Sequence, residues 1–198
     1  MATKEFEVPN WSQIYAMLLS QAVKIRRSGF KPDVIVGVTR GGWVPARVLS
    51  DLLGIHALAI IRVEFYLVVA ETQNAPVLTQ GVSADVKEKK VLLVDDVADT
   101  GKSLRLAVEH LKQHGASEVR VATVYRKPLS VVTPDYWEKE TLGWVVFPWD
   151  AKEIIRKILE KHGDENTVNV ETAKLVKAGL PKQLVEESLK EIFEERKC

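Results

Sequence analysis

Cysteine is almost absent from this chain: Cys198, the last residue, is the only one among 198. A single cysteine cannot form an internal disulfide, so a disulfide-rich secreted scaffold is excluded and a reducing compartment is favoured. We expect Cys198 to be a mobile terminal thiol. The chain also has no apolar run near the roughly 20 residues needed to cross a bilayer, and its start, MATKEFEVPN, lacks the apolar core of a secretory signal. We therefore expect a cytoplasmic protein with no membrane partner.

A large net charge of either sign is missing as well. The 28 Lys and Arg residues nearly balance the 27 Asp and Glu residues, which argues against a broad nucleic-acid-binding surface. An anionic ligand must therefore be held by local geometry. The length fits one well-filled domain, and the only marked shift in composition is the enrichment in Lys and Glu after Asp150. We expect a core domain over residues 1–150 and a helical extension over residues 151–198.

Hydrophobic periodicity predicts alternating helices and strands up to Asp150. Apolar residues at helical spacing predict helices that end near Gly29, Gly54 and Gly115. Short apolar runs, typical of strands buried on both faces, occur at residues 34–38, 57–63, 91–94, 119–125 and 144–147. This alternation predicts an α/β fold with an open parallel sheet and helices on both of its faces.

Two further segments leave alternatives open. Residues 64–83 show no clean period, so they form a long loop or a weak hairpin, and serve either as a lid or as a plain surface excursion. Helices are expected at about 152–162, 170–177 and 181–196, the last with an apolar stripe of Leu184, Val185, Leu189, Ile192 and Phe193. That stripe needs a partner surface, either in its own domain or on a second subunit.

Chemically unusual residues follow four of the predicted strands. Open parallel sheets bind ligands beyond the carboxyl ends of their strands, so these junctions are the candidate site. They are Thr39-Arg40-Gly41-Gly42, Asp95 to Ser103, Arg126-Lys127-Pro128 and Pro148-Trp149-Asp150. We expect all four to share one rim of the sheet.

The turn Thr100-Gly101-Lys102-Ser103 opens directly into a predicted helix. Backbone amides there, with a lysine and two hydroxyls, form a ready phosphate site, and the alternative is a plain N-cap by Asp99 or Thr100. Asp95 and Asp96 favour the ligand site, because two acids after an apolar strand need a cation or hydroxyl groups to meet them. A nucleotide P-loop is excluded, since its pattern requires glycine where this chain has Asp96.

The stretch VLLVDDVADTGKS, residues 91–103, resembles the signature with which type I phosphoribosyltransferases bind phosphoribosyl pyrophosphate (PRPP). The resemblance implies that Asp95 and Asp96 bind the ribose hydroxyls. It implies that the 5′-phosphate is held by Ala98, Asp99, Thr100, Gly101, Lys102 and Ser103. It also implies that Mg²⁺ accompanies PRPP, and that pyrophosphate is gripped by the loop Thr39, Arg40, Gly41 and Gly42.

The residues that would meet the base resemble those of the 6-oxopurine enzymes. Asp99 stands where adenine enzymes usually carry alanine, which implies proton exchange at purine N7. Lys127 would donate to the exocyclic O6, unless it is a solvated surface lysine or Arg126 takes its place. The segment Trp144-Val145-Val146-Phe147-Pro148-Trp149-Asp150 is similar to the purine-binding strand of bacterial xanthine–guanine enzymes.

The same resemblance assigns roles within that segment. The ring of Trp144 would stack on the base, the backbone of Val145 would meet its polar edge, and Trp149 would serve packing. Asp150 would lie near the 2-position of the base and, with Asp96, near the metal. Without the resemblance, Trp144 would be interpreted as a core aromatic residue.

The resemblance covers about Val34–Asp150 and implies transfer of the phosphoribosyl group of PRPP to N9 of hypoxanthine, guanine or xanthine, a purine-salvage reaction. It further implies a homodimer or homotetramer. Two rival functions stay open: a PRPP- or nucleotide-sensing regulator on the same fold, and a phosphoribosyltransferase for another base. The family's mobile loop usually contains a Ser-Tyr pair, which is absent here; Tyr66 is the only tyrosine in residues 64–83, so we assign no catalytic residue there.

Overall fold

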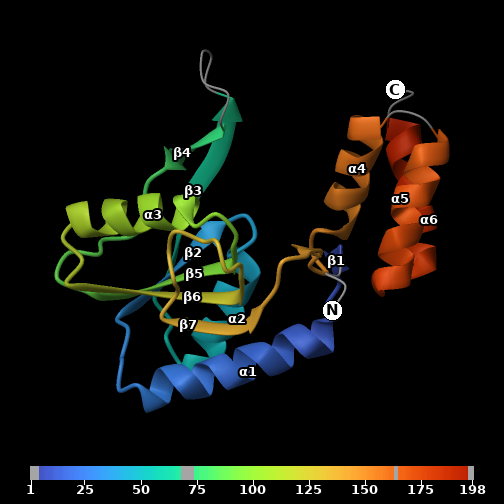
Figure 1. The fold of residues 1–198 in the computed structure, drawn as a ribbon. Helices are drawn as coiled ribbons and strands as arrows, with labels where there is room; N and C mark the ends of the chain where they lie inside the picture. The colour runs from blue at the N-terminus through green and yellow to red at the C-terminus, as the bar shows by residue number, and fades with distance from the viewer. Residues whose placement is uncertain (1–4, 68–73, 163–164, 196–198) are drawn as a thin grey trace. The chain divides into compact units, whose positions relative to one another are not determined.

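The computed structural model describes residues 5–67, 74–162 and 165–195 (Figure 1). Cys198 and the middle of the 64–83 segment lie outside these ranges. The chain forms two compact units: the sheet unit, Ile14–Thr141, and the helical unit, Met1–Gln13 together with Leu142–Cys198. Compactness thus divides the chain after Thr141, whereas the domain boundary after Asp150, which was expected from composition, stays a prediction.

The sheet unit is built on six strands in the order β4-β3-β2-β5-β6-β7. Their bounds are β2 Val34–Thr39, β3 Leu58–Leu67, β4 Asn74–Gln80, β5 Lys90–Ala98, β6 Glu118–Arg126 and β7 Tyr136–Glu140. Neighbouring strands run parallel except β3 and β4, which pair antiparallel. The open, mostly parallel sheet is confirmed, and the 64–83 segment contributes to a hairpin rather than to a structureless loop.

Helices cover both faces of this sheet (Figure 1). The helices α1 Trp11–Arg27 and α2 Trp43–Leu53 lie on one face, and α3 Lys102–Gln113 lies on the other. The face toward α3 holds the main core, in which apolar side chains of β2, β3, β5 and β6 pack against those of α3. Gly54 ends α2 as predicted: its φ of 70° is a left-handed conformation that glycine adopts without a steric penalty.

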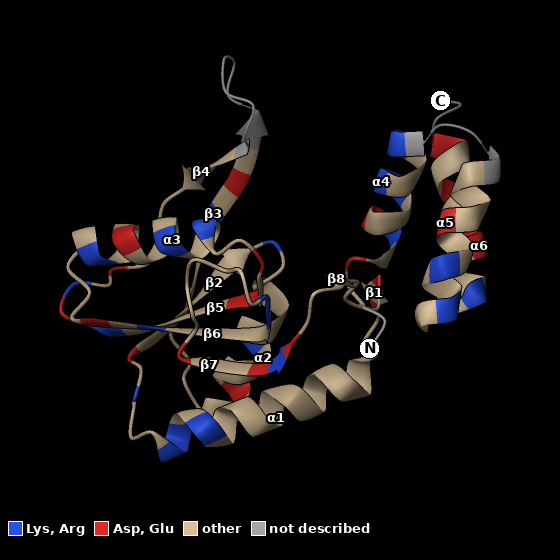
Figure 2. Ribbon diagram, in the orientation of Figure 1, with Lys and Arg blue, Asp and Glu red and all other residues tan. Residues whose placement is uncertain are grey.

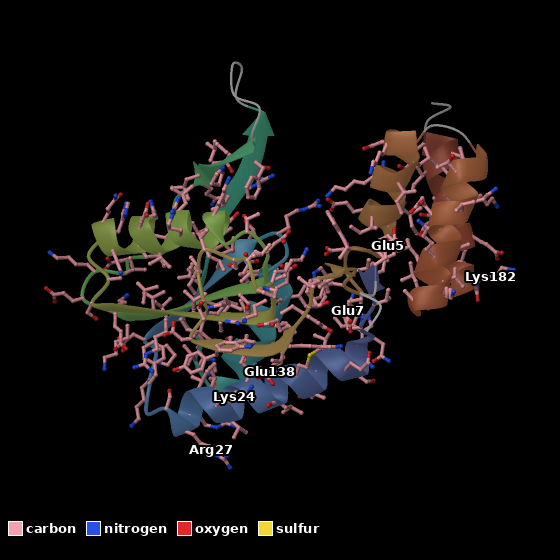
Figure 3. The ribbon with its side chains drawn as sticks, in the orientation of Figure 1. Glu5, Glu7, Lys24, Arg27, Glu138 and Lys182 are labelled. Carbon is pink, nitrogen blue, oxygen red and sulfur yellow. The ribbon has the colours of Figure 1, made fainter. Side chains whose placement is uncertain are left out.

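The helix α1 is held against the sheet by both polar and charged contacts. Gln21 is fully buried and its Nε2 donates to the carbonyl oxygen of Thr123 at 2.8 Å. Lys24 Nζ lies 2.9 Å from a carboxylate oxygen of Glu138 in β7 (Figure 3). The charged side chains of α1 are confined to its last turn, where cations complement the helix dipole (Figure 2).

The strand that follows β6 in the sheet is not the predicted one. Residues 144–147 were expected as the fifth strand of the sheet, but they are not part of it, and Tyr136–Glu140 pairs with β6. β7 is an edge strand in which only Tyr136 is buried. An edge strand needs no continuous apolar run, and the charged residues Glu138, Lys139 and Glu140 conceal it in the sequence.

The helical unit packs three helices beside a small second sheet. Its elements are β1 Phe6–Glu7, β8 Trp144–Val145, α4 Ala151–His162, α5 Glu165–Ala178 and α6 Lys182–Glu195. β1 and β8 run parallel, with Phe6 opposite Trp144 and Glu7 opposite Val145. The expected fifth strand is therefore a two-residue strand of a separate sheet.

The apolar stripe of α6 is satisfied mainly within its own unit. Val185 and Ile192 are buried with side chains of α4 and α5, and Leu189 packs at the edge of the same cluster. Leu184 and Phe193 remain exposed. Throughout the described ranges, no helix combines the length and the apolar character that crossing a bilayer requires.

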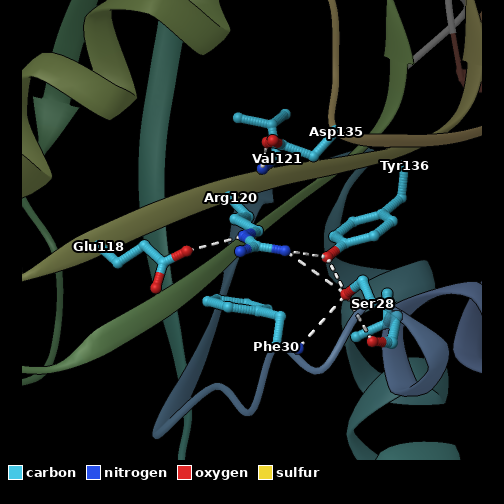
Figure 4. Close-up of polar contacts among 8 residues, drawn as sticks. Ser28, Phe30, Glu118, Arg120, Val121, Asp135 and Tyr136 are labelled. Carbon is cyan, nitrogen blue, oxygen red and sulfur yellow. Dashed lines mark hydrogen bonds and ion pairs between the residues drawn. The ribbon is translucent and has the colours of Figure 1, made fainter.

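A polar network ties the amino ends of β6 and β7 to the connection between α1 and β2 (Figure 4). Arg120 donates to Glu118 Oε1 at 2.7 Å and to the Tyr136 hydroxyl at 2.9 Å. The Tyr136 hydroxyl also lies 2.7 Å from Ser28 Oγ, and the guanidinium of Arg120 covers the ring of Phe30 at 4.5 Å from its centre. The bond to Tyr136 is the main reason why the pKa of Arg120 lies above its ordinary value. This network joins β6, β7 and the α1–β2 connection at the amino ends of the strands, whereas the predicted site loops follow the carboxyl ends.

Candidate active site

Three of the four predicted loops meet at the end of the sheet where the carboxyl ends of its parallel strands lie. They follow β2, β5 and β6, which are adjacent parallel strands, so their carboxyl ends lie side by side. The fourth loop, residues 148–150, follows β8, which pairs with β1 and is no part of this sheet. The expectation that all four loops share one rim of the sheet is therefore wrong for this loop, since the apolar run before it pairs with the start of the chain.

The two acids of the signature lie inside β5 rather than after it. The strand was expected to end at Val94 but continues to Ala98, because β6 pairs with it as far as Arg126. Asp96 is buried, with 9% of its surface exposed, and its backbone N–H donates to Asp95 Oδ1 at 3.0 Å. Burial of a carboxylate is costly unless other groups meet it, so this pair is suited to a cationic or hydroxyl-bearing ligand.

The glycines after β2 allow their loop to lie directly on β5. A methyl group on Gly41 would overlap the carboxylate of Asp96, and one on Gly42 would collide with the carbonyl oxygen of Val94. Thr39 Oγ1 donates to the carbonyl oxygen of Ile61 at 3.2 Å, which orients the start of the loop. The predicted pyrophosphate loop is thus in contact with a predicted ribose-binding acid. Arg40, in the same loop, is exposed.

The turn before α3 has the geometry of an anion site rather than of a side-chain cap. Gly101 is the N-cap residue, with a φ of 75°, and within the described chain no side-chain hydrogen bond caps the helix there. Lys102 N lies 3.4 Å from Thr100 Oγ1, which is a long hydrogen bond. The alternative of a plain N-cap by Asp99 or Thr100 is therefore not what the structure adopts. The first-turn amides and the dipole of α3 point to this turn, beside Ser103.

A lysine and an acid that directly follow the neighbouring strands β6 and β5 form an ion pair at the same end of the sheet. Lys127 Nζ lies 3.0 Å from Asp99 Oδ1, and the backbone N–H of Lys127 donates to the carbonyl oxygen of Ala98 at 2.9 Å. Arg126 is directed elsewhere: it pairs with Glu140 at 2.6 Å and lies over the ring of Trp137. Lys127 rather than Arg126 therefore faces Asp99.

The remaining predicted base-binding residues belong to the helical unit. Trp144 is 51% exposed, so it is not a core aromatic residue, and its backbone N–H donates to the carbonyl oxygen of Glu5 at 2.9 Å. Val145 is buried, and Asp150 directly precedes α4, where its carbonyl oxygen accepts from Ile154 N at 2.9 Å. The ring of Trp149 stacks on Phe147 at 4.8 Å, as expected of a packing residue.

The acids of β5 suit a magnesium ion that arrives with its substrate. Mg²⁺ is commonly bound by one or two carboxylates together with substrate phosphates, rather than by a cage of protein ligands. Asp95 and Asp96 supply such carboxylates beside the glycine loop. In the described part of the chain, no three His, Cys, Asp or Glu residues are grouped to hold a metal alone. Asp150 belongs to the other unit, so the metal role suggested for it stays a prediction.

Residues 129–132, which follow the predicted junction Arg126-Lys127-Pro128, also lie at this end of the sheet and were not predicted to do so. Residues 127–132 leave the end of β6 and lie against the turn Thr100-Gly101-Lys102-Ser103, where Val131 N donates to the carbonyl oxygen of Thr100 at 3.0 Å. A methyl group on Gly101 would lie 2.5 Å from Ser130 Oγ. Pro128 and Pro134 predict a loop here, but no residue type in this loop predicts a contact with Gly101.

Comparison with known proteins agrees with this geometry. The phosphoribosyl transferase domain matches residues 7–155. The chain is 34% identical to a xanthine-guanine phosphoribosyltransferase of Cereibacter sphaeroides over 157 residues, which cover 74% of this chain and 87% of that protein. A second xanthine-guanine phosphoribosyltransferase, from Nitratidesulfovibrio vulgaris, is 34% identical over 120 residues, or 60% of this chain and 69% of the relative.

Among solved structures, the chain resembles a purine phosphoribosyltransferase from Pyrococcus horikoshii. The two superpose with a TM-score of 0.67 at 41% sequence identity, covering 73% of this chain and 93% of that one. The matched domain extends over the whole sheet unit, Ile14–Thr141, which carries the three loops. This chain therefore belongs to the phosphoribosyl transferase domain family.

Proposed function

We propose that this phosphoribosyltransferase transfers the 5-phosphoribosyl group of PRPP to N9 of a 6-oxopurine base, giving a nucleoside 5′-monophosphate and pyrophosphate. The xanthine-guanine activity of its named relatives supports this substrate class. Hypoxanthine, guanine and xanthine differ at the 2-position, and we propose that the enzyme accepts one or more of them in purine salvage.

The observation that carries the proposal is the pair Lys127 and Asp99, 3.0 Å apart. In a 6-oxopurine, O6 and N7 lie on the same edge, so a lysine donor and a carboxylate acceptor at this spacing can meet both atoms. Adenine carries an amino group at that position, and an ammonium group would face it donor to donor. A regulator that senses PRPP alone has no use for this pair, which disfavours that rival.

Asp99 would take part in the proton transfer. As N9 bonds to the ribose carbon, the base loses the proton at N7, and the Asp99 carboxylate is the acceptor that we propose for it. The electron pair of the broken carbon–oxygen bond leaves with pyrophosphate. General-base help of this kind is worth roughly 10²–10⁴-fold in rate.

The rest of the loop Asp95 to Ser103 and the loop after β2 would hold PRPP. The amides at Gly101 and Ser103, with Lys102, would bind the 5′-phosphate, and the ribose hydroxyls would meet Asp95 and Asp96. The loop at Arg40 to Gly42 would bind pyrophosphate. Bound Mg²⁺, held by Asp96 and the substrate, would stabilise the charge that develops on the leaving group. The exposed Trp144 is our proposed stacking partner for the base.

Nucleotide formation from a panel of bases tests the proposal. The protein is incubated with PRPP, Mg²⁺ and hypoxanthine, guanine, xanthine, adenine, uracil or orotate, and the monophosphates are separated and quantified. We expect product with at least one 6-oxopurine and a kcat/KM for adenine at least tenfold lower. Binding of PRPP without product from any base would favour the regulator instead.

Lys127 offers a sharper test of the base. Lys127→Met should raise KM for the 6-oxopurine about tenfold or more, since a charge-assisted hydrogen bond to O6 is lost. Arg126→Met is the matched control, because Arg126 pairs with Glu140 and should leave this KM unchanged. We further propose a cytoplasmic homodimer or homotetramer, which sedimentation analysis would test.

A further inference from the structure

We infer that Ser130 is a positioning residue that holds Lys127 and the turn Thr100-Gly101-Lys102-Ser103, which we call the phosphate turn, in one fixed arrangement. The inference rests on the proposed function, because that function assigns Gly101 to phosphate binding and Lys127 to base binding. Residues 127–132, which we call the bridging segment, join these two parts of the site.

The bridging segment is hydrogen-bonded to the end of β5 on both sides of Asp99. Lys127 N donates to the carbonyl oxygen of Ala98 at 2.9 Å, and Val131 N donates to the carbonyl oxygen of Thr100 at 3.0 Å. The residue between these two acceptors is Asp99, the proposed proton acceptor. The segment therefore fixes the backbone from which that carboxylate projects.

Ser130 forms hydrogen bonds to both ends of the bridging segment. Its N–H donates to the carbonyl oxygen of Lys127 at 3.1 Å, and its hydroxyl donates to the carbonyl oxygen of Val132 at 2.8 Å. Val132 packs against the main core and anchors that end of the segment. The serine hydroxyl thus links the core-anchored end to the turn that carries Lys127.

Ser130 also lies directly on the phosphate turn. A methyl group on Gly101 would come 2.5 Å from Ser130 Oγ and 2.7 Å from Val132 N, so the segment fills the space beside this glycine. Side-chain packing does not hold the middle of the segment, since Leu129 is 86% exposed and Val131 is 59% exposed. Hydrogen bonds and the contact with Gly101 fix it instead, which makes Ser130 the side chain whose loss should matter.

Loss of the Ser130 hydroxyl should therefore disturb two substrates at once. The phosphate turn would lose its packing partner, and Lys127 would lose its fixed distance from Asp99. Ser130→Ala should raise KM for PRPP and KM for the base together, each about five- to tenfold, which is the effect of losing one partly buried hydrogen bond. A residue that served only folding would lower the melting temperature without moving both KM values.

The test measures kcat, both KM values and the melting temperature for the wild type and three variants. Ser130→Thr keeps the hydroxyl and should restore both KM values to within about twofold of wild type. Thr133→Ala removes an exposed hydroxyl just beyond the bridging segment and should leave both unchanged. If Ser130→Ala leaves both KM values within twofold of wild type, or raises only one of them, the inference is wrong.

Calorimetric binding of PRPP with Mg²⁺ separates this inference from the proposed function. Binding of PRPP needs no base, so it reports on the phosphate turn even in a protein without turnover. A wild-type protein that makes no nucleotide refutes the proposed function, whereas weaker PRPP binding by Ser130→Ala would still support the role of Ser130. Normal turnover with equal PRPP affinity in both proteins refutes only the role of Ser130.

Discussion

The two ends of the six-stranded sheet use polar residues in opposite ways. At the amino end, the polar side chains form hydrogen bonds with one another, and these bonds hold β6 and β7 to the α1–β2 connection (Figure 4). The residues are Arg120, Glu118, Tyr136 and Ser28. At the carboxyl end, Gly41 and Gly42 bring the loop after β2 so close to β5 that no side chain fits between them, and Lys127 and Asp99 form an ion pair beside it.

The difference separates stability from function within one sheet. A network whose members satisfy one another rigidifies a structure but offers nothing to a ligand. Glycine turns and a buried acid cost stability and leave donors and acceptors directed at a substrate. Changes at the carboxyl end should therefore act first on catalysis, and changes at the amino end should act on unfolding alone.

The largest effect is expected from the acid at the carboxyl end. Asp99→Ala should lower kcat about 10²–10⁴-fold while the dissociation constant of PRPP changes by less than about threefold, because the proton acceptor is lost and the phosphate amides remain. The matched control is Asp135→Ala at the amino end, where Asp135 Oδ2 accepts from Val121 N at 2.7 Å. That variant should keep kcat and lose about 1 kcal/mol of unfolding free energy. Steady-state kinetics and urea unfolding measure both; an unchanged kcat in Asp99→Ala removes the assigned role.

Glycine-to-alanine substitutions at the two ends should differ in their effect on PRPP binding. At the carboxyl end the new methyl group meets neighbouring backbone atoms, whereas at the amino end it only strains the backbone of its own residue. Gly42→Ala places a methyl group against backbone atoms of Val38, Val94 and Asp95, which cannot give way as a flexible side chain would. We expect a loss of about 1–3 kcal/mol in unfolding free energy together with at least tenfold weaker PRPP binding. Gly29→Ala, at the end of α1, meets open space at a φ of 74° and should cost about 1 kcal/mol with PRPP binding intact. Equal PRPP affinity in both variants would contradict the comparison.

The amino-end network should respond in stability only. Arg120→Met removes the bonds to Glu118 and Tyr136 and should lower the unfolding free energy by about 1–2 kcal/mol, with kcat and both KM values within twofold of wild type. Tyr136→Phe keeps the ring and should cost less, since Arg120 retains Glu118. Urea denaturation beside steady-state kinetics measures both quantities. A fall in kcat/KM for Arg120→Met would show that the two ends are coupled.

The sequence predicted the elements whose signals are local. β2 is a continuous apolar run, and Gly54 marks the end of α2, so both appear in the structure close to their expected bounds. β7 could not be predicted in this way, since an edge strand tolerates Glu138 and Glu140 and so leaves no apolar run. The parallel pairing of Trp144–Val145 with Phe6–Glu7 joins distant parts of the chain, and no local pattern encodes it.

In the candidate site, too, the features with a local sequence signal were predicted, and those that depend on distant parts of the chain were not. The signature around Asp96 was readable because several chemically unusual residues stand together in the sequence. The distance between Lys127 and Asp99 was not, because it depends on β5 and β6 being neighbours, and strand order is a property of the whole sheet. Ser130 was missed for the same reason: its partner Gly101 follows a different strand.

The smallest effect is expected from a histidine near the amino end of the sheet. His110 lies in the last turn of α3, where its Nε2 accepts a hydrogen bond from Val82 N at 3.2 Å and its ring is tilted by 35° against the ring of His114, with 3.9 Å between the ring centres. Burial, and to a smaller degree the neighbouring His114, lower the pKa of His110 below its ordinary value. Protonation would remove the acceptor for Val82, so the folded state favours the neutral ring.

Because the folded pKa lies below the unfolded one, His110 should stabilise the protein fully above about pH 6.5, and this contribution should fall as the pH drops through the lowered folded pKa. Urea unfolding between pH 7.5 and pH 5 should show His110→Gln losing less stability than wild type, by about 0.5 kcal/mol or less, since solvent screens the partly exposed ring. His56→Gln, at an exposed position before β3, should follow the wild-type profile. A His110→Gln profile parallel to wild type would mean that protonation of this ring is as easy in the folded protein as in the unfolded chain. The amino end would then hold no pH-sensitive contact at Val82, and its polar groups would act through the Arg120 network alone.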